Sequence, residues 1–192
     1  MDINIEKQLQ KISGAISGAI TDLNSNEASD HAKLYYEFIR KTNTDVNRIV
    51  ENTIYNKDQV YLVKNYLFLQ KHDLAVGHTY FAPDLCIAQS WQRLAYDPKN
   101  IKPHDLTLIA HELKEMELIT QGMSQREAHN YVCTYYPELN YQKQAEKYYN
   151  DLKIKLDKCP KNAGAIVYYK NVKKNKIKNH VKFKHEYEED ER

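Results

Sequence analysis

The residues of this sequence that are best suited to chemistry are histidines and their acidic neighbours in one part of the chain. Five of the eight histidines lie between residues 72 and 129. An imidazole titrates near neutral pH, so a histidine beside a carboxylate suits proton transfer, and the same pair can bind a divalent metal. The candidate catalytic set consists of His72, Asp73, Arg93, His104, Asp105, His111, Glu112, Glu115 and His129.

Three members of this set share one face of a predicted helix that begins at residue 103. At about 100° per residue, His104, His111 and Glu115 fall within roughly 40° of one another. The side nearly opposite is apolar and is expected to face the core. It is formed by Leu106, Ile109, Leu113 and Met116. The stripe predicts a metal site or an acid–base cluster, and the alternative is an ordinary solvated helix face.

A metal site would use His111 and Glu115, one turn apart, together with His129 from the following helix. Glu112 would then act as the general base. The zinc-peptidase pattern His-Glu-x-x-His is absent, because Glu115 occupies the position of the second histidine. This argues against a conventional zinc peptidase. A divalent metal is the one cofactor that these residues suggest, and its identity stays open.

Signals for helix ends place these groups in a helical hairpin from residue 103 to about 135. Pro103 suits a first helical position, where its missing N–H costs nothing. Gly122 fits a helix C-terminus, and Ser124 followed by Glu127 is a capping-box pattern that begins a second helix. The tight corner would allow His129 to fold back toward the stripe.

Periodicity along the rest of the chain predicts an all-α fold of about seven helices around one core. The sequence has only five glycines and five prolines, which disfavours a β-rich fold with many turns. Further helices are expected at 2–23, 27–41, from 43 or 44 onward, at 57–70, 85–95 and 141–157. The segment 71–83 loses its periodicity and is expected to be a loop.

We divide the chain into an amphipathic N-terminal helix (1–24), a helical domain (25–158) and a lysine-rich tail that ends in an acidic segment (159–192). The N-terminal helix could pack on the domain or mediate self-association. The tail is expected either to form a short β-hairpin or to be disordered. Its lysines could bind a nucleic-acid backbone, or could serve only to keep the chain in solution. The candidates for that contact are Lys170, Lys173, Lys174, Lys176 and Lys178.

Cysteine use and the N-terminus indicate a protein made in a reducing cytosol. Three scattered cysteines without a Cys-x-x-Cys pair do not make a disulfide framework. The first residues lack the basic and apolar regions of a signal peptide, and no apolar run approaches the roughly 20 residues that span a bilayer. We therefore expect a cytoplasmic location and no membrane partner, with action in a target cell left open.

Six short motifs follow one another in a fairly specific order. They are Lys-Asn-Tyr-Leu-Phe (64–68), His-Asp-Leu (72–74), Ala-Gln-Ser-Trp-Gln-Arg-Leu (88–94), His-Asp-Leu (104–106), His-Glu-Leu-x-Glu (111–115) and Gly-Met-Ser-x-x-x-Ala-His (122–129). From about residue 35 to 150, this order resembles a small helical domain at the C-terminal end of bacterial polymorphic toxins and phage head-morphogenesis (minor capsid) proteins. The resemblance implies a toxin or effector domain, with an immunity protein as a partner, and attaches no reaction to it.

Three functions agree with these observations. The favoured one, by analogy with toxin domains of this size, is a nuclease that cleaves RNA or DNA with histidine and acidic groups, with or without a metal. Arg93 would then stabilise the phosphate in the transition state. One alternative is a metal-dependent hydrolase acting on protein or another substrate that is not a nucleic acid. The other is a non-catalytic helical interaction module or phage structural protein.

Overall fold

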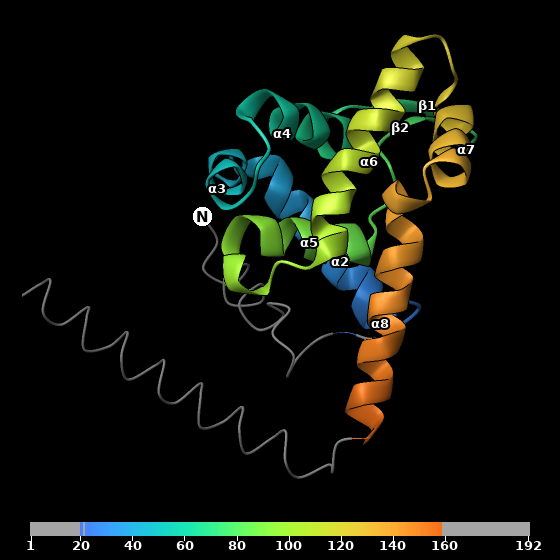
Figure 1. The fold of residues 1–192 in the computed structure, drawn as a ribbon. Coiled ribbons are helices and arrows are strands. Elements are labelled where there is room, and N and C mark those ends of the chain that lie inside the picture. Colours follow the sequence, from blue (N-terminus) through green and yellow to red (C-terminus); the bar gives the residue numbers. More distant parts are fainter. Residues whose placement is uncertain (1–19, 21, 159–192) are drawn as a thin grey trace, which may run out of the picture. The chain divides into compact units, whose positions relative to one another are not determined.

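The computed structural model describes residue 20 and residues 22–158 of the chain, which contain seven α-helices and one short hairpin (Figure 1). The helices are α2 (Asn26–Lys41), α3 (Asp45–Asn52), α4 (Lys57–Lys64), α5 (Leu85–Tyr96), α6 (Pro103–Thr120), α7 (Gln125–Tyr135) and α8 (Tyr141–Lys158). A π-helical turn, η1 (Asn65–Leu69), continues α4, and two 3₁₀ turns, η2 (Pro98–Asn100) and η3 (Pro137–Leu139), precede α6 and α8. The predicted all-α class is confirmed for this part of the chain.

Side-chain caps explain why several helices begin where the sequence predicts. The Ser25 hydroxyl accepts a hydrogen bond from the backbone N–H of Ala28 at the start of α2. Asp84 accepts in the same way from Ile87 at the start of α5, with an N···O distance of 2.9 Å. These caps satisfy backbone donors that the first turn of a helix cannot pair internally.

The segment predicted as a loop contains a small antiparallel hairpin, β1 (His72–Leu74) and β2 (Gly77–Thr79). His72 pairs with Thr79, and Leu74 pairs with Gly77. Gly77 has a φ of +111°, which a glycine adopts readily at a turn. Strands of three residues are too short to show the alternation by which a strand is recognised in a sequence, so the hairpin was not predicted.

The core is rich in aromatic residues, and Trp91 is its largest fully buried side chain. The largest side chains that are almost entirely buried are Trp91, Arg93, Tyr35, Tyr36, Tyr149, Phe68, Ile39, Ile49, Leu94, Leu108 and Ile109. The indole N–H of Trp91 donates to Asp45 at 2.9 Å, and the ammonium of Lys64 lies 2.7 Å from the same carboxylate. These bonds satisfy three buried polar groups, so we read Asp45 and Lys64 as structural.

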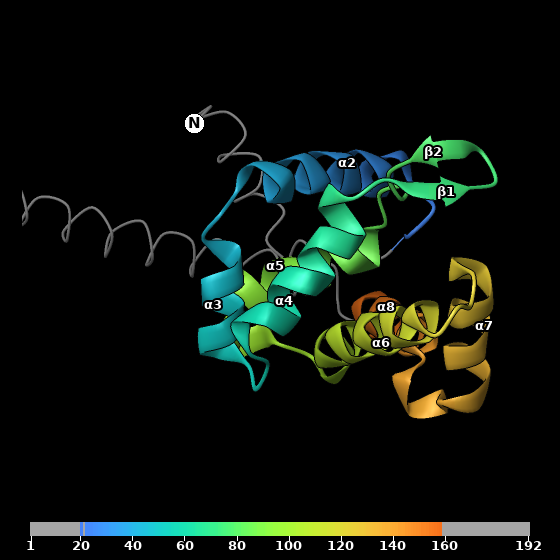
Figure 2. The same ribbon diagram turned by 90° about the horizontal axis from the view of Figure 1, so that it is seen from above.

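Helix α6 is the element on which the candidate groups depend. It contacts α4, α5 and α7, and Figure 2 shows it running beside α7 when the molecule is seen from above. Residues up to Asp151 belong to one compact unit. A second unit begins at Leu152, and the described part of it consists of the last turns of α8.

Two predicted segments lie outside the described residues. They are the amphipathic N-terminal helix, apart from its last residues, and the lysine-rich tail from residue 159 onward. Among the helices that the structure describes, none combines the length and the apolar character needed to cross a membrane.

Candidate functional site

The corner between α6 and α7 brings polar side chains of the two helices close to one another. Gly122 has a φ of +102°, and its N–H donates to the carbonyl of Ile119, which ends α6. Ser124 then begins α7 through a reciprocal capping box with Glu127. As the sequence predicts, α7 folds back along α6, and His129 lies beside His111 and Glu115.

Three donor atoms meet at this point. The Nδ1 atom of His129 lies 3.3 Å from Nε2 of His111 and 3.1 Å from Oε2 of Glu115. The third side of the triangle, from His111 Nε2 to Glu115 Oε2, is 3.5 Å. Ligands 2.0–2.1 Å from a tetrahedral zinc ion are about 3.3 Å from one another. This three-donor site (His111 Nε2, Glu115 Oε2, His129 Nδ1) therefore has the edge lengths of a metal site.

Hydrogen bonds with neighbouring residues hold the side chains of His111 and Glu115 in place. Nδ1 of His111 donates to the carbonyl of Leu139 at 2.9 Å, so its Nε2 atom carries a lone pair. The hydroxyl of Tyr66 donates to Oε1 of Glu115 at 2.6 Å, and the amide of Gln125 donates to the same oxygen at 3.2 Å. Oε2 is left to face the two imidazoles. Such supporting bonds fix the tautomer and orientation of metal ligands.

The pKa values of the two acidic residues of the site are shifted in opposite directions. Burial alone would raise the pKa of Glu115, but hydrogen bonds with His111, His129 and Tyr66 outweigh it and lower the pKa to about 2. Burial, followed by the negative charge of Glu115, raises the pKa of Glu112 well above its ordinary value. The hydrogen bond with Glu115 raises the pKa of His129. The pKa values of the two carboxyl groups are thus shifted apart, as is typical of the acid and base of hydrolytic sites.

A cavity of about 190 Å³ opens on the three-donor site. His111, Glu112 and His129 line it, together with residues at the start of α5 and along α8. Glu112 is 6% exposed and hydrogen-bonds to no other described residue. Its carboxyl group is therefore free to bind a partner in the cavity that it lines.

Cys133 is a neighbour of the site that the sequence reasoning missed. It lies one turn after His129 on α7, with Sγ 3.7 Å from Nε2 of that histidine. Its donor atom and those of His111 and His129 all lie within 4.8 Å of one another. The spacing of four residues between His129 and Cys133 was the available signal. Tyr66 and Gln125 gave no comparable signal, since they reach Glu115 from other elements.

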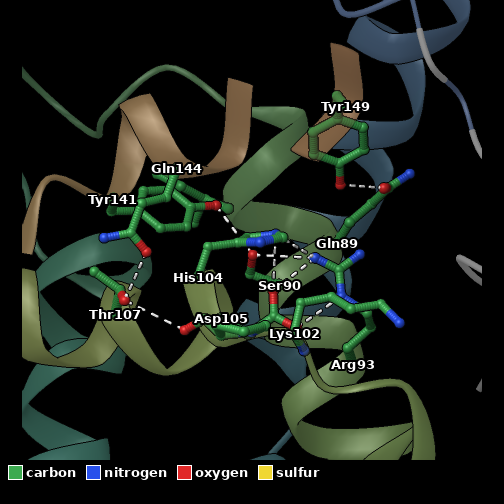
Figure 3. A network of polar contacts seen from close by, with 12 residues as sticks. Gln89, Ser90, Arg93, Lys102, His104, Asp105, Thr107, Tyr141, Gln144 and Tyr149 are labelled. Atoms are coloured by element: carbon green, nitrogen blue, oxygen red, sulfur yellow. Dashed lines mark hydrogen bonds and ion pairs between the residues drawn. The ribbon is translucent and has the colours of Figure 1, made fainter. Parts of the chain in front are cut away.

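Three other candidates form a separate buried arginine network (Arg93, Asp105, His104 and Ser90), drawn in Figure 3. Arg93 is 2% exposed and bonds Asp105 through two nitrogens, at 2.8 and 2.6 Å. His104 accepts from Arg93 at 3.1 Å, and burial, with a smaller effect of Arg93, lowers its pKa to about 4. Seven residues of helix, about 10 Å, separate His104 from His111. We assign this network a role in packing.

The hairpin carries the remaining candidates. His72 is buried, its Nε2 donates to the carbonyl of Tyr66 at 2.7 Å, and its ring stacks on Phe81 at 4.1 Å. Asp73 is exposed and pairs with His78 at 2.8 Å across the hairpin. His72 thus supports the segment that holds Tyr66, whereas Asp73 lies outside the cavity lining.

The structure therefore brings together His111, Glu115 and His129, with Glu112 beside them in the cavity lining, and the other five candidates lie outside that lining. The five tail lysines lie outside the described residues. Comparison with protein families, curated proteins and solved structures finds no match to this chain.

Proposed function

We propose that the protein is a metal-dependent hydrolase whose divalent ion is held by His111, Glu115 and His129. The observation that carries the proposal is the triangle of donor atoms, with sides of 3.1, 3.3 and 3.5 Å. Two imidazoles and one carboxylate are a donor set that zinc commonly takes in catalytic sites, where a fourth position stays open for water. Such an ion activates water or polarises the bond to be cleaved.

The residues around the site are suited to the accompanying proton transfers. Glu112 faces the cavity beside His111 and can accept a proton from water, then donate it to the leaving group. A nearby cation would favour its ionised form, since an opposite charge lowers the pKa of a carboxyl group. For Nδ1 of His129 to act as a ligand, its ring proton must occupy Nε2, which faces Cys133 Sγ.

A thiol hydrolase is the second candidate, because Cys133, His129 and Glu115 are aligned as nucleophile, base and orienting acid. One observation favours the metal. Burial, with the charges of Glu115 and Glu112, raises the pKa of the Cys133 thiol, which disfavours the thiolate.

Zinc titration by calorimetry tests the proposal directly. We expect one ion per chain for the parent, and affinity at least 10-fold weaker for His111→Gln and His129→Gln. His78→Gln is the matched control, because His78 is an exposed imidazole on the hairpin. If zinc, manganese and cobalt all fail to bind the parent, the proposal is wrong.

Hydrolysis is then measured with the zinc-loaded protein on a protein substrate, on RNA and on plasmid DNA. The same assay tests the nuclease predicted from the resemblance to toxin domains. Cleavage that is abolished by a chelator and restored by zinc would support the proposal. Binding of zinc without cleavage of any substrate would instead favour a structural ion in a non-catalytic module.

A further inference from the structure

Apart from the imidazoles of His111 and His129, the side chains of the cavity lining that can carry a charge at neutral pH are carboxyl groups. Three carboxyl side chains line the cavity, those of Asp84, Glu112 and Glu146, and no lysine or arginine does so among the described residues. Asp84 and Glu146 are exposed to solvent. None of the ion pairs among the described residues involves either of them. Both carboxylates can therefore form an ion pair with a cationic ligand that enters the cavity.

In each of these two carboxylates, only one oxygen accepts a hydrogen bond from another described residue. Oδ1 of Asp84 accepts from the backbone of Ile87, and Oε1 of Glu146 accepts from Gln142 at 3.2 Å. The second oxygen of each has no partner within the described part of the chain. A carboxylate can accept several hydrogen bonds, so both can still bind a donor.

Glu112 gives a second observation, beside the two exposed carboxylates, that a polar group belongs in this cavity. It is more than nine-tenths buried, lines the cavity and lacks a hydrogen-bond partner among the described residues. Buried polar side chains are almost always hydrogen-bonded in native proteins. An unpartnered one that faces a cavity indicates that water or a bound molecule supplies the missing partner.

The apolar residues of the lining and the volume of the cavity further restrict the chemical class and the size of the ligand. Leu23, Ile87 and Ala145 contribute apolar surface, which suits an aliphatic stem. The volume of about 190 Å³ is smaller than the roughly 300–1,000 Å³ of pockets for drug-sized ligands. A single side chain therefore fits this space better than a nucleotide does. An apolar stem with a charged end is the character of a lysine side chain.

We infer that the substrate places a cationic group on an aliphatic stem, such as a lysine side chain, into this cavity, with Asp84 and Glu146 as its specificity determinants. The inference rests on the proposed hydrolase and names its substrate class as a basic peptide or related amine. A phosphodiester would bring its negative charge beside Asp84 and Glu146, which have no cationic partner among the described residues, and like charges close together repel.

The test uses small probes, so it does not depend on turnover. n-Butylammonium, butanol and butyl phosphate are titrated separately into the zinc-free and the zinc-loaded full chain, and the backbone amide NMR signals of residues around the cavity are followed. We expect n-butylammonium to bind at least 10-fold more tightly than butanol, and butyl phosphate to give no saturable shift at these residues in the zinc-free protein.

Two variants connect the result to the named side chains. The double variant Asp84→Asn, Glu146→Gln keeps the shape of both residues and the α5 cap, and should reduce the preference for n-butylammonium over butanol at least 10-fold. Asp30→Asn changes an exposed acid of α2 that does not line the cavity, and should leave the preference as it is. Equal binding of the amine and the alcohol by the parent, or tighter binding of butyl phosphate by the zinc-free protein, overturns the inference. A protein that binds n-butylammonium but no metal would overturn the proposed hydrolase instead.

Discussion

The phenolic hydroxyl of Tyr66 donates to Oε1 of Glu115 at 2.6 Å, which joins the π-helical turn η1 to the C-terminal half of α6. Residues 49 positions apart in the chain are thereby fixed against each other. The bond stabilises the ionised carboxylate and leaves its other oxygen facing the imidazoles of His111 and His129.

Tyr66→Phe should therefore weaken zinc binding while the fold persists. The variant removes one donor to a buried carboxylate, and loss of such a supporting bond typically costs about 10- to 100-fold in metal affinity. Calorimetric titration with zinc measures the change. Tyr61→Phe, at an exposed tyrosine of α4, is the control and should bind as the parent does. Unchanged affinity in Tyr66→Phe would show that Glu115 is not a ligand.

Glu112→Gln should separate metal binding from catalysis. The amide keeps the size of the side chain but cannot accept a proton, so we expect kcat to fall by about 100-fold or more. Zinc affinity should stay within about three-fold of the parent, because Glu112 is not one of the three donors. Glu117→Gln, an exposed change on the same helix, should alter neither quantity. A Glu112 variant with full activity would remove this residue from the mechanism.

Cys133→Ser distinguishes the metal hydrolase from the thiol hydrolase. If the ion activates water, the thiol takes no part in bond formation, and kcat/KM should remain within about three-fold of the parent. If Cys133 is the nucleophile, activity should be lost and iodoacetamide should inactivate the parent. Both measurements are made on whichever substrate the parent cleaves, with the chelated protein as reference.

Acid should destabilise the domain through two buried histidines. Burial lowers the pKa of His31 to about 4, and burial with a smaller effect of Arg93 does the same for His104. The unfolded chain, with histidine pKa values near 6.5, binds more protons than the folded one between pH 6.5 and 4. The free energy of unfolding should therefore fall as the pH drops through this window, by at most on the order of 3 kcal/mol per histidine, and level off below pH 4.

Urea denaturation at pH 4.5 and pH 7 measures this effect. His31 stacks on Tyr35, and neither of its ring nitrogens has a hydrogen-bond partner among the described residues, so His31→Leu should reduce the difference between the two pH values. His78→Gln changes an exposed histidine and should preserve it. A pH dependence that is the same in all three proteins would exclude His31 as a cause.

Asp105→Asn should show that the buried arginine network is structural. The variant leaves the guanidinium of Arg93 buried without its anionic partner, and breaking a buried ion pair in this way typically costs about 3–5 kcal/mol. Asp30→Asn removes a partner from an exposed pair and should cost less than about 1 kcal/mol. The two free energies of unfolding come from urea titrations at neutral pH. A small loss for Asp105→Asn would contradict the assigned packing role.

Most of the helices, and the proximity of His111, Glu115 and His129, could be predicted from the sequence, because both depend on local rules. A spacing of four residues on a helix sets the relation of His111 to Glu115 whatever surrounds them. Gly122 and the capping box at Ser124 fixed the corner that returns His129 to them. These are local rules, and they hold wherever the helices form.

The burial of each candidate side chain and its contacts with distant segments could not be predicted from the sequence. His104 lies on the same predicted stripe as His111, yet its environment is set by Arg93 on α5, so it became part of the packing. His72 was predicted to act in the site and instead holds the carbonyl of Tyr66. Nothing in the local pattern distinguishes a histidine that faces a cavity from one that satisfies a buried partner.

The side chains of the three-donor site also form hydrogen bonds with segments that are distant along the chain. Glu115 of α6 is bonded to Tyr66 of η1 and to Gln125 and His129 of α7, and His111 is bonded to the carbonyl of Leu139 in η3. An ion bound at this point would hold all of them at once, since binding to the folded state alone adds to its stability. Trace-metal supply would then govern the lifetime of the protein as well as its activity, and starvation for zinc would expose the chain to proteolysis.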